Sequence, residues 1–304
     1  MIRQSLNRLT PYLFMAPAVV IMAIALFYPL LYMIVGSFRD WDPSQNISEA
    51  AYVGLANYAK LLGDAAFRES VSVTLTFAFT VVSAEMLLGV GLALLLDRNI
   101  RGMSILRTLF ILPMMIAPVV VGLVWRFMYH PTDGIFNRWL TALDLPRVDW
   151  LGNHALLSVI IADIWQWTPF IFILSLAALQ SLPSSALEAA RIDGATGWQQ
   201  IVHIKLPLMA PVLIVTMLLR LIDAFKVLEV ILVMTEGGPG LSTEILALRI
   251  ARTAQEFREL GEAAAMSNYL LLLLLVLTLG MFAFTRWQEA RARRQQAMQF
   301  REEG

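Results

Sequence analysis

The chain contains no cysteine among its 304 residues. Disulfides, thiolate nucleophiles and cysteine-based metal sites are therefore excluded. Charge is also scarce, because only 15% of the residues are Asp, Glu, Lys or Arg, whereas 58% are hydrophobic. A soluble globular domain carries about 25% charged residues, so this composition is typical of a chain embedded in a lipid bilayer and not of a nucleic-acid-binding protein.

Lysine is especially rare, and each of the three lysines follows an alanine, an isoleucine or a phenylalanine: Lys60, Lys205 and Lys226. A phosphate-cradling loop needs Gly-Lys-[Ser/Thr], so this chain has no Walker A motif. The three histidines are scattered and give little support for a metal site. We therefore expect no cofactor in this chain, and any ATP and Mg²⁺ to be bound by a separate ATPase.

Six apolar stretches are long enough to cross about 30 Å of hydrocarbon. They predict an all-α membrane protein of six transmembrane helices in one transmembrane domain covering residues 1–304, with spans near 13–37, 72–96, 105–128, 155–178, 209–234 and 264–285. The first span is too long for the apolar region of a signal peptide, and we interpret it as a retained anchor. Pro113 and Pro118 interrupt the third span and predict a bend, whether mobile or static.

A polar segment, residues 180–207, separates the fourth and fifth spans. Ser184 or Ser185 is expected to cap a short helix, Gly194 to form a turn, and Pro207 to stop a second amphipathic helix. The spacing Glu188-Ala189-Ala190, three residues, Gly194, nine residues, Ile-x-Leu-Pro resembles the EAA loop of permease subunits of binding-protein-dependent ABC importers. An incidental interfacial hairpin is the alternative interpretation.

Segments elsewhere are similar to the carbohydrate-uptake branch of that family, the maltose and glycerol-phosphate type: residues 52–58, 165–170 and 236–244. The resemblance implies a permease heterodimer with a second permease subunit, a dimer of ATPase subunits, and an extracytoplasmic sugar-binding protein. It also implies that the first helix of the loop is a coupling helix that docks on the ATPase. The coupling residues would be Glu188, Ala189, Ala190, Asp193, Gly194 and Pro207. The extra helices and large outer domain of the maltose-type large subunit are missing here.

Charge asymmetry sets the expected orientation. Lys and Arg gather at the N-terminus, the turn near 97–107, the 180–207 loop and the C-terminal tail, while the remaining loops are acid-rich. The positive-inside rule then places both termini and the 180–207 loop in the cytoplasm of a multi-pass protein of the bacterial inner membrane, in contact with membrane lipid.

Ionisable residues inside the spans are expected to face a cavity or a partner. Arg220, Asp223, Lys226 and Glu229 follow one another at three-residue steps and alternate in sign. Two interpretations stay open: a polar face along the substrate path, or an ion-pair ladder that holds the helix against a neighbour. Glu85, a single carboxylate in the second span, is equally open.

Aromatic side chains at a similar depth suggest how a sugar would bind. Trp165 and Trp167 could stack on the apolar face of a sugar ring, with Asp163 and Gln166 at its hydroxyl rim. Together with Arg220, Asp223 and Lys226 these residues form the predicted substrate path. For either tryptophan, bulk that packs helices together is an equal alternative.

A transporter of another kind and a membrane enzyme are the two alternative classes of function. A secondary transporter or channel for a small polar solute would also carry charges inside the membrane, but it gives no reason for the 188–207 segment. A membrane enzyme would have only the carboxylate pair Asp163 and Asp223 available, and nothing supports that chemistry. The sequence therefore predicts a transport subunit, not an enzyme, that passes a sugar or related polyol across the membrane.

Overall fold

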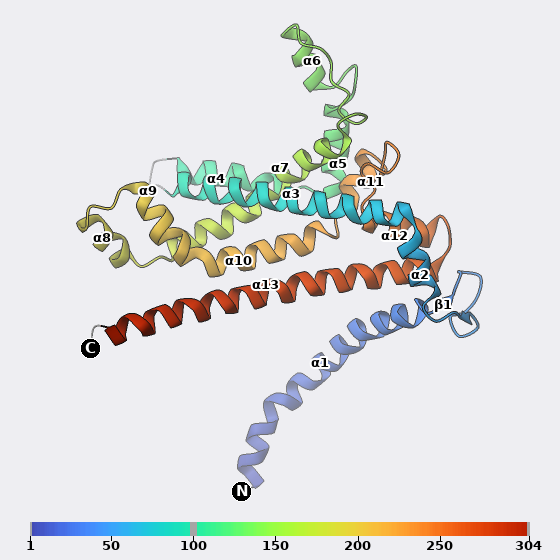
Figure 1. Cartoon of the computed structure of the whole chain (residues 1–304), viewed down its shortest axis with the longest axis horizontal. Coiled ribbons are helices and arrows are strands. Elements are labelled where there is room, and N and C mark those ends of the chain that lie inside the picture. Colours follow the sequence, from blue (N-terminus) through green and yellow to red (C-terminus); the bar gives the residue numbers. More distant parts are fainter. Residues whose placement is uncertain (1, 98–101, 303–304) are drawn as a thin grey trace. The chain divides into compact units, whose positions relative to one another are not determined.

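The computed structural model describes residues 2–97 and 102–302, and most of them are helical. The elements in chain order are α1 (Ile2–Gly36), β1 (Arg39–Asp40), β2 (Ala51–Tyr52), α2 (Ala56–Gly63), α3 (Ala65–Leu96), α4 (Met103–Ile111), the 3₁₀ turn η1 (Leu112–Met115), α5 (Pro118–Met128), α6 (Ile135–Ala142), α7 (Ala155–Gln180), α8 (Ser184–Ile192), α9 (Gly197–Gln200), the π turn η2 (Ile201–Lys205), α10 (Leu206–Ala224), α11 (Glu229–Met234), α12 (Leu246–Gln255) and α13 (Leu260–Glu302) (Figure 1).

Within residues 2–97 and 102–302, five helices are long and apolar enough to cross a membrane, and the number rises to six if the bent pair α4–α5 forms one span. The helical membrane architecture predicted from the sequence is confirmed, while the count of six spans stays a prediction. The chain divides into two compact units. Unit 1 comprises residues up to Ala65 together with Ile250–Leu273, and unit 2 comprises Ala66–Arg249 with the residues from Leu274 onward.

In unit 1, the two short strands β1 and β2 pair in antiparallel fashion, with Arg39 opposite Tyr52. Lys60 of α2 forms ion pairs with Glu259 and Glu262 at the start of α13. The Gly261 amide donates to the Trp41 carbonyl at 3.0 Å, so the strand pair, α2 and the start of α13 are joined.

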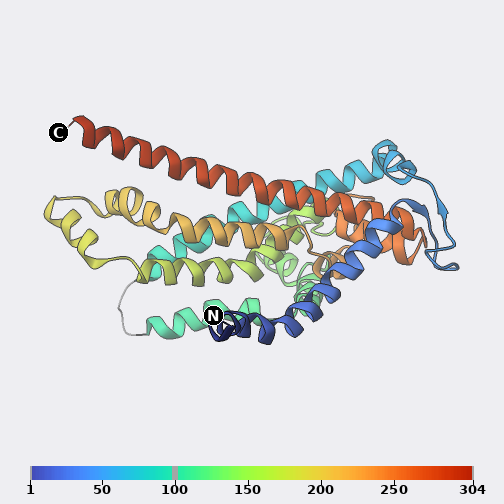
Figure 2. The same ribbon diagram turned by 90° about the horizontal axis from the view of Figure 1, so that it is seen from below.

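In unit 2, α7 packs against α10 and, through a close approach at Gly89, against α3 (Figure 2). A Cβ at Gly89 would come within 2.8 Å of Ile171 Cβ, so only a glycine lets the two backbones lie this close. The buried core at one end of these helices contains Ala93, Phe172, Leu176 and Met209.

The third span is bent by 96° between Met115 and Pro118. Ile116 and Ala117 are extended, with ψ of 134° and 136°. For Ala117 the cause is Pro118, because proline disfavours the helical conformation in the residue before it. The interruption expected at Pro113 and Pro118 is confirmed, but the span does not continue straight from 105 to 128.

The fifth span also differs from the prediction. The expected helix over 209–234 ends at Ala224, and the separate helix α11 starts only at Glu229. Phe225 is fully buried at the break, and Val233 of α11 packs on Gly122 of α5, where an added Cβ would come within 3.0 Å. Tertiary packing thus overrides the continuous apolar pattern. The row of charges at three-residue steps therefore ends at Asp223, and Lys226 and Glu229 lie outside α10, both exposed.

Candidate functional site

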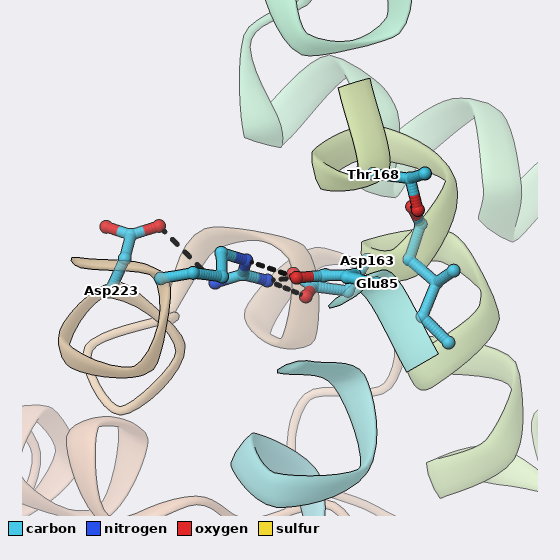
Figure 3. A network of polar contacts seen from close by, with 6 residues as sticks. Glu85, Asp163, Thr168 and Asp223 are labelled. Carbon is cyan, nitrogen blue, oxygen red and sulfur yellow. Dashed lines mark hydrogen bonds and ion pairs between the residues drawn. The ribbon is translucent and has the colours of Figure 1, made fainter. Parts of the chain in front are cut away.

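A buried ionic cluster joins three helices of unit 2, with Arg220 of α10 at its centre (Figure 3). Arg220 Nε and Nη2 donate to the two carboxylate oxygens of Glu85 on α3, at 2.7 and 2.9 Å. Nη2 also donates to Asp163 Oδ2 on α7. This fork-to-carboxylate geometry is the strongest form of charge-assisted hydrogen bond in proteins.

The cluster is removed from solvent, since Glu85 and Asp163 are 0% exposed and Arg220 is 1% exposed. One guanidinium therefore faces two buried carboxyl groups. Loss of the guanidinium would leave the buried carboxyl groups without a cation, which costs about 3–5 kcal/mol. The three side chains therefore fix α3, α7 and α10 relative to one another.

Asp223 lies at the open side of the cluster. Its side chain is 48% exposed, and its Oδ2 is 3.5 Å from Arg220 Nη1, too far for a strong hydrogen bond. Arg220 Nη1 is buried and has no hydrogen-bond partner within the described residues. On another side of the guanidinium, the Trp167 ring centroid is 5.3 Å from Arg220 Cζ, a cation–π distance.

The structure thus brings together four of the predicted path residues, namely Asp163, Trp167, Arg220 and Asp223. For Arg220 the contacts are those of an ion-pair ladder, whereas the half-exposed Asp223 remains accessible from outside the cluster.

The other predicted path residues make different contacts. Gln166 is buried and donates to the Ile116 carbonyl at 3.0 Å. Trp165 is two residues from Trp167, on another side of α7, and its ring packs edge-on against Trp125 at 5.8 Å. The two tryptophans therefore do not line one surface. Lys226 is exposed in the turn after α10.

The sequence alone assigns Glu85 neither to the path nor to an ion pair, and the structure shows it as a principal partner of Arg220. The available signal was a single carboxylate in an otherwise apolar span, because hydrocarbon tolerates such a group only next to a partner. The identity of that partner, 135 residues away, could not be inferred from spacing.

The segment between α7 and α10 forms two short helices that meet at Gly194. Gly194 has φ of +77°, in the left-handed region that favours glycine. Its amide donates to the Arg191 carbonyl at 3.1 Å, and the Ala195 amide donates to the Ala190 carbonyl at 2.9 Å. This pair of hydrogen bonds is a Schellman motif, so the predicted turn is confirmed.

Two details of that prediction are wrong. The residue that precedes α8 is Pro183, with no side-chain cap, so Ser184 and Ser185 lie inside the helix instead of capping it. Pro207 does not stop a helix, because the chain stays helical from Gly197 through the π turn η2 into α10, and Pro207 lies in the first turn of α10. The second helix α9 is capped by Thr196 and Gln199 in a capping box, which the pattern Thr-x-x-Gln could have revealed.

The remaining loop residues are mostly at the surface. Glu188 and Ala189 are exposed, Ala190 is buried, and Asp193 is the exposed C-cap of α8. Two large apolar side chains, Ile192 and Trp198, are 86% and 72% exposed. Exposed apolar side chains gathered on one short segment are typical of a surface that contacts a partner.

Among the described residues, no group of three or more His, Cys, Asp or Glu side chains could hold a metal ion. Apolar spans, a buried charge cluster and a protruding helical loop together define a membrane transport component. The family model of the binding-protein-dependent transport system inner membrane component matches residues 85–294. The chain belongs to this family.

Curated relatives agree over most of the chain. It is 38% identical to the trehalose/maltose transport system permease protein MalF of Thermococcus litoralis, over 77% of this chain and 79% of that one. It is 33% identical to the sn-glycerol-3-phosphate transport system permease protein UgpA of Agrobacterium fabrum, over 91% and 95%.

The same fold occurs in a solved structure of a bacterial alginate ABC transporter in complex with an alginate pentasaccharide-bound periplasmic protein. The TM-score is 0.82 at 23% identity, over 93% of this chain and 96% of that chain. At this identity the similarity establishes the fold alone.

Proposed function

We propose that this chain is the permease subunit of an ATP-driven importer that translocates a sugar or related polyol delivered by an extracytoplasmic binding protein. The α8–Gly194–α9 loop carries the proposal, because it presents exposed apolar and acidic side chains at the end of unit 2 where α7 ends and α10 begins (Figure 1). The trehalose/maltose and glycerol-phosphate relatives support a carbohydrate or polyol as the substrate class.

In this proposal the loop faces the cytoplasm, as do both termini. Glu188, Ala189, Ala190, Asp193 and Gly194 contact one subunit of an ATPase dimer, which binds ATP and Mg²⁺. Pro207 lies in the first turn of α10. In this proposal, α10 transmits the movement of the ATPase to Arg220 and the ionic cluster. A second permease subunit completes the pathway, and the binding protein docks on the opposite side.

The substrate path in this proposal runs past Asp223 and Trp167. The Asp223 carboxylate is half exposed and can accept hydrogen bonds from sugar hydroxyls. Trp167 is stacked on the Arg220 guanidinium, which holds its ring in a fixed orientation. Asp163 and Arg220 are buried and do not reach the substrate path, so they act as positioning residues for Trp167 and Asp223.

Co-purification and reconstitution test whether the chain is a subunit of an ATP-driven importer. The tagged chain is expected to co-purify with a second permease and an ATPase, and reconstituted uptake is expected to require ATP and the binding protein. Uptake by the single chain without ATP would instead establish a secondary transporter or channel.

The variant Asp223→Asn tests the path. Because its carboxylate is half exposed, we expect normal assembly and basal ATPase activity with reduced substrate uptake. The matched control is Glu229→Gln, an exposed carboxylate at the start of α11, which should leave uptake unchanged. If Asp223→Asn fails to assemble while Glu229→Gln assembles normally, then Asp223 is a structural ion-pair partner of Arg220 and not a path residue.

A further inference from the structure

A polar pocket of about 520 Å³ lies in unit 2 at the first turns of α3 and α7, at the end of α7 opposite to the α8–Gly194–α9 loop (Figure 1). This volume is in the range of small-molecule sites, about 300–1,000 Å³. Val73, Leu157 and Ile160 contribute apolar surface. The polar side chains come from α3, from the turn before α7 and from the turn after α11: Glu69, Ser72, Thr76, Asn153, His154 and Ser242.

These six polar side chains are exposed, and within the described part of the chain none of them forms a side-chain hydrogen bond or an ion pair. Other helical threonines behave differently, since Thr74 and Thr168 donate their hydroxyls to the carbonyl four residues earlier, both at 2.6 Å. The hydroxyl, amide and imidazole groups of the pocket can donate and accept hydrogen bonds, and the Glu69 carboxylate accepts them. Sugar hydroxyls, which also donate and accept, are chemically matched to this lining.

Charge narrows the choice of ligand. Glu69 is the one carboxylate of the lining, and no lysine or arginine is among the lining residues that the structure describes. An anionic solute would place like charge beside Glu69 with no cation to compensate it. One carboxylate also supplies too few oxygens for a divalent cation, which takes six or more. The lining therefore fits a neutral molecule rich in hydroxyl groups.

The pocket lies beside the proposed substrate path. Ile160 lines the pocket, and Asp163, three residues further along α7, bonds Arg220 of the ionic cluster. Residues three apart share one face of a helix, so about one turn separates the pocket from the cluster. Trp167 follows about one turn further, at the Arg220 guanidinium.

We propose that this pocket is a subsite for a neutral sugar or polyol and that it disfavours phosphorylated sugars and uronates. The proposal rests on the importer function proposed above and narrows its substrate class. In it, Glu69 and Thr76 bond the hydroxyls of the solute at the outer end of unit 2, before the solute reaches Trp167 and Asp223.

Saturation-transfer NMR on the intact transporter in nanodiscs, without binding protein or nucleotide, tests the subsite. The neutral probes are glucose, maltose, trehalose and glycerol, and the anionic counterparts are glucose 6-phosphate, glucuronate and sn-glycerol 3-phosphate. The wild type should bind at least one neutral probe and not its anionic counterpart. Glu69→Gln should raise the Kd of that neutral probe about tenfold, the size of one charge-assisted hydrogen bond, and Thr76→Val about fivefold. Glu69→Arg should allow glucose 6-phosphate to bind.

Two matched controls lie in unit 2 outside the pocket. Thr108→Val removes an exposed hydroxyl of α4, which donates to the Ser104 carbonyl at 3.0 Å. Asp133→Arg reverses a carboxylate that is 74% exposed in the turn between α5 and α6. Both controls should bind the neutral probes like the wild type and should not bind glucose 6-phosphate.

The proposal is overturned if no neutral probe binds, if glucose and glucose 6-phosphate bind equally to the wild type, or if Glu69→Gln and Thr76→Val leave the Kd unchanged. Normal probe binding with weaker association of the extracytoplasmic binding protein in these variants would instead identify a protein-docking surface. Uptake measured on the same samples separates the two proposals, because uptake without ATP would refute the importer and leave the pocket result standing. If Glu69→Arg fails to assemble, Glu69→Gln and Thr76→Val still decide.

Discussion

Arg220 and Glu85 form a bidentate pair in the membrane, with both carboxylate oxygens of Glu85 bonded by one guanidinium from a helix 135 residues further along the chain. Asp163 shares the same guanidinium. Among the described residues, Arg220 is therefore the one cation bonded to these two fully buried carboxyl groups, and the three positions should not respond equally to neutralisation.

Arg220→Met should be more damaging than Glu85→Gln. The methionine leaves two carboxylates without a cation and should cost at least about 3–5 kcal/mol, whereas Glu85→Gln leaves the balanced pair Arg220–Asp163. Size-exclusion chromatography of detergent-solubilised protein measures the folded fraction, with the exposed Glu69→Gln on the same helix as control. A greater loss of folded protein in Glu85→Gln than in Arg220→Met would contradict this account of the charge balance.

The contact between α3 and α7 depends on a glycine. An added Cβ at Gly89 would lie 2.8 Å from Ile171 Cβ and 3.0 Å from the Phe172 backbone nitrogen, so Gly89→Ala should destabilise the protein by about 1–3 kcal/mol. Gly91→Ala is the matched control, because an added Cβ there would meet nothing within 4 Å. Thermal unfolding of both variants checks the prediction, and equal melting temperatures would rule out a tight contact at Gly89.

In unit 1, the hydrogen bond from Lys60 to Glu262 raises the pKa of Lys60 above its ordinary value of 10.5. A pKa raised by folding means that the interaction contributes stability below the unfolded value and loses it as the pH rises through the folded value. The Lys60 side chain is 59% exposed, so screening limits the contribution to about 1 kcal/mol or less.

Lys60→Met should therefore lower the melting temperature slightly at neutral pH, and the difference from the wild type should shrink above pH 10.5. Scanning fluorimetry over a pH series measures the melting temperatures of the variant and the wild type. Arg138→Met, which removes an exposed cation paired with Asp133 at 3.5 Å, serves as the control. A difference that stays constant through the alkaline range would mean that Lys60 acts through packing and not through its charge.

Features set by local residue chemistry were the ones that the sequence predicted well. Apolar length gave the approximate positions of the spans, and glycine between two polar helices gave the turn at Gly194, because φ above zero favours that residue. Pro118 indicated a break in the third span, but the bend of 96° depends on how α5 packs against α11, which no local pattern encodes.

Features set by tertiary contacts could not be predicted from the sequence, because no local pattern encodes them. Residues 227–234 are apolar apart from Glu229, so hydropathy alone extends the fifth span through the break at which Phe225 is buried. Spacing on α10 paired Arg220 with Asp223 and Lys226, whereas its short hydrogen bonds go to Glu85 and Asp163 on other helices. A single sequence contains no measure of such distant pairings.

Gly194 joins α8 to α9 with φ of +77°, and its amide donates to the Arg191 carbonyl. Gly194→Ala forces a left-handed conformation on a residue with a Cβ, at about 1–2 kcal/mol, and Gly194→Pro also removes the N–H. Since the loop is exposed, both variants should leave the transmembrane helices folded while changing the angle between α8 and α9. In the proposed transporter, Gly194→Pro and Glu188→Lys should therefore reduce substrate transported per ATP hydrolysed.

Gly197→Ala is the matched control for this loop, because Gly197 has no positive φ and an added Cβ would meet nothing within 4 Å. It should behave as the wild type in both uptake and ATPase assays. Wild-type coupling in Gly194→Pro and Glu188→Lys would show that the loop does not transmit ATP-driven motion. Loss of folded protein in Gly194→Pro, with Gly194→Ala still folded, would move the test to the milder substitution, whose coupling ratio should fall between those of Gly197→Ala and Glu188→Lys.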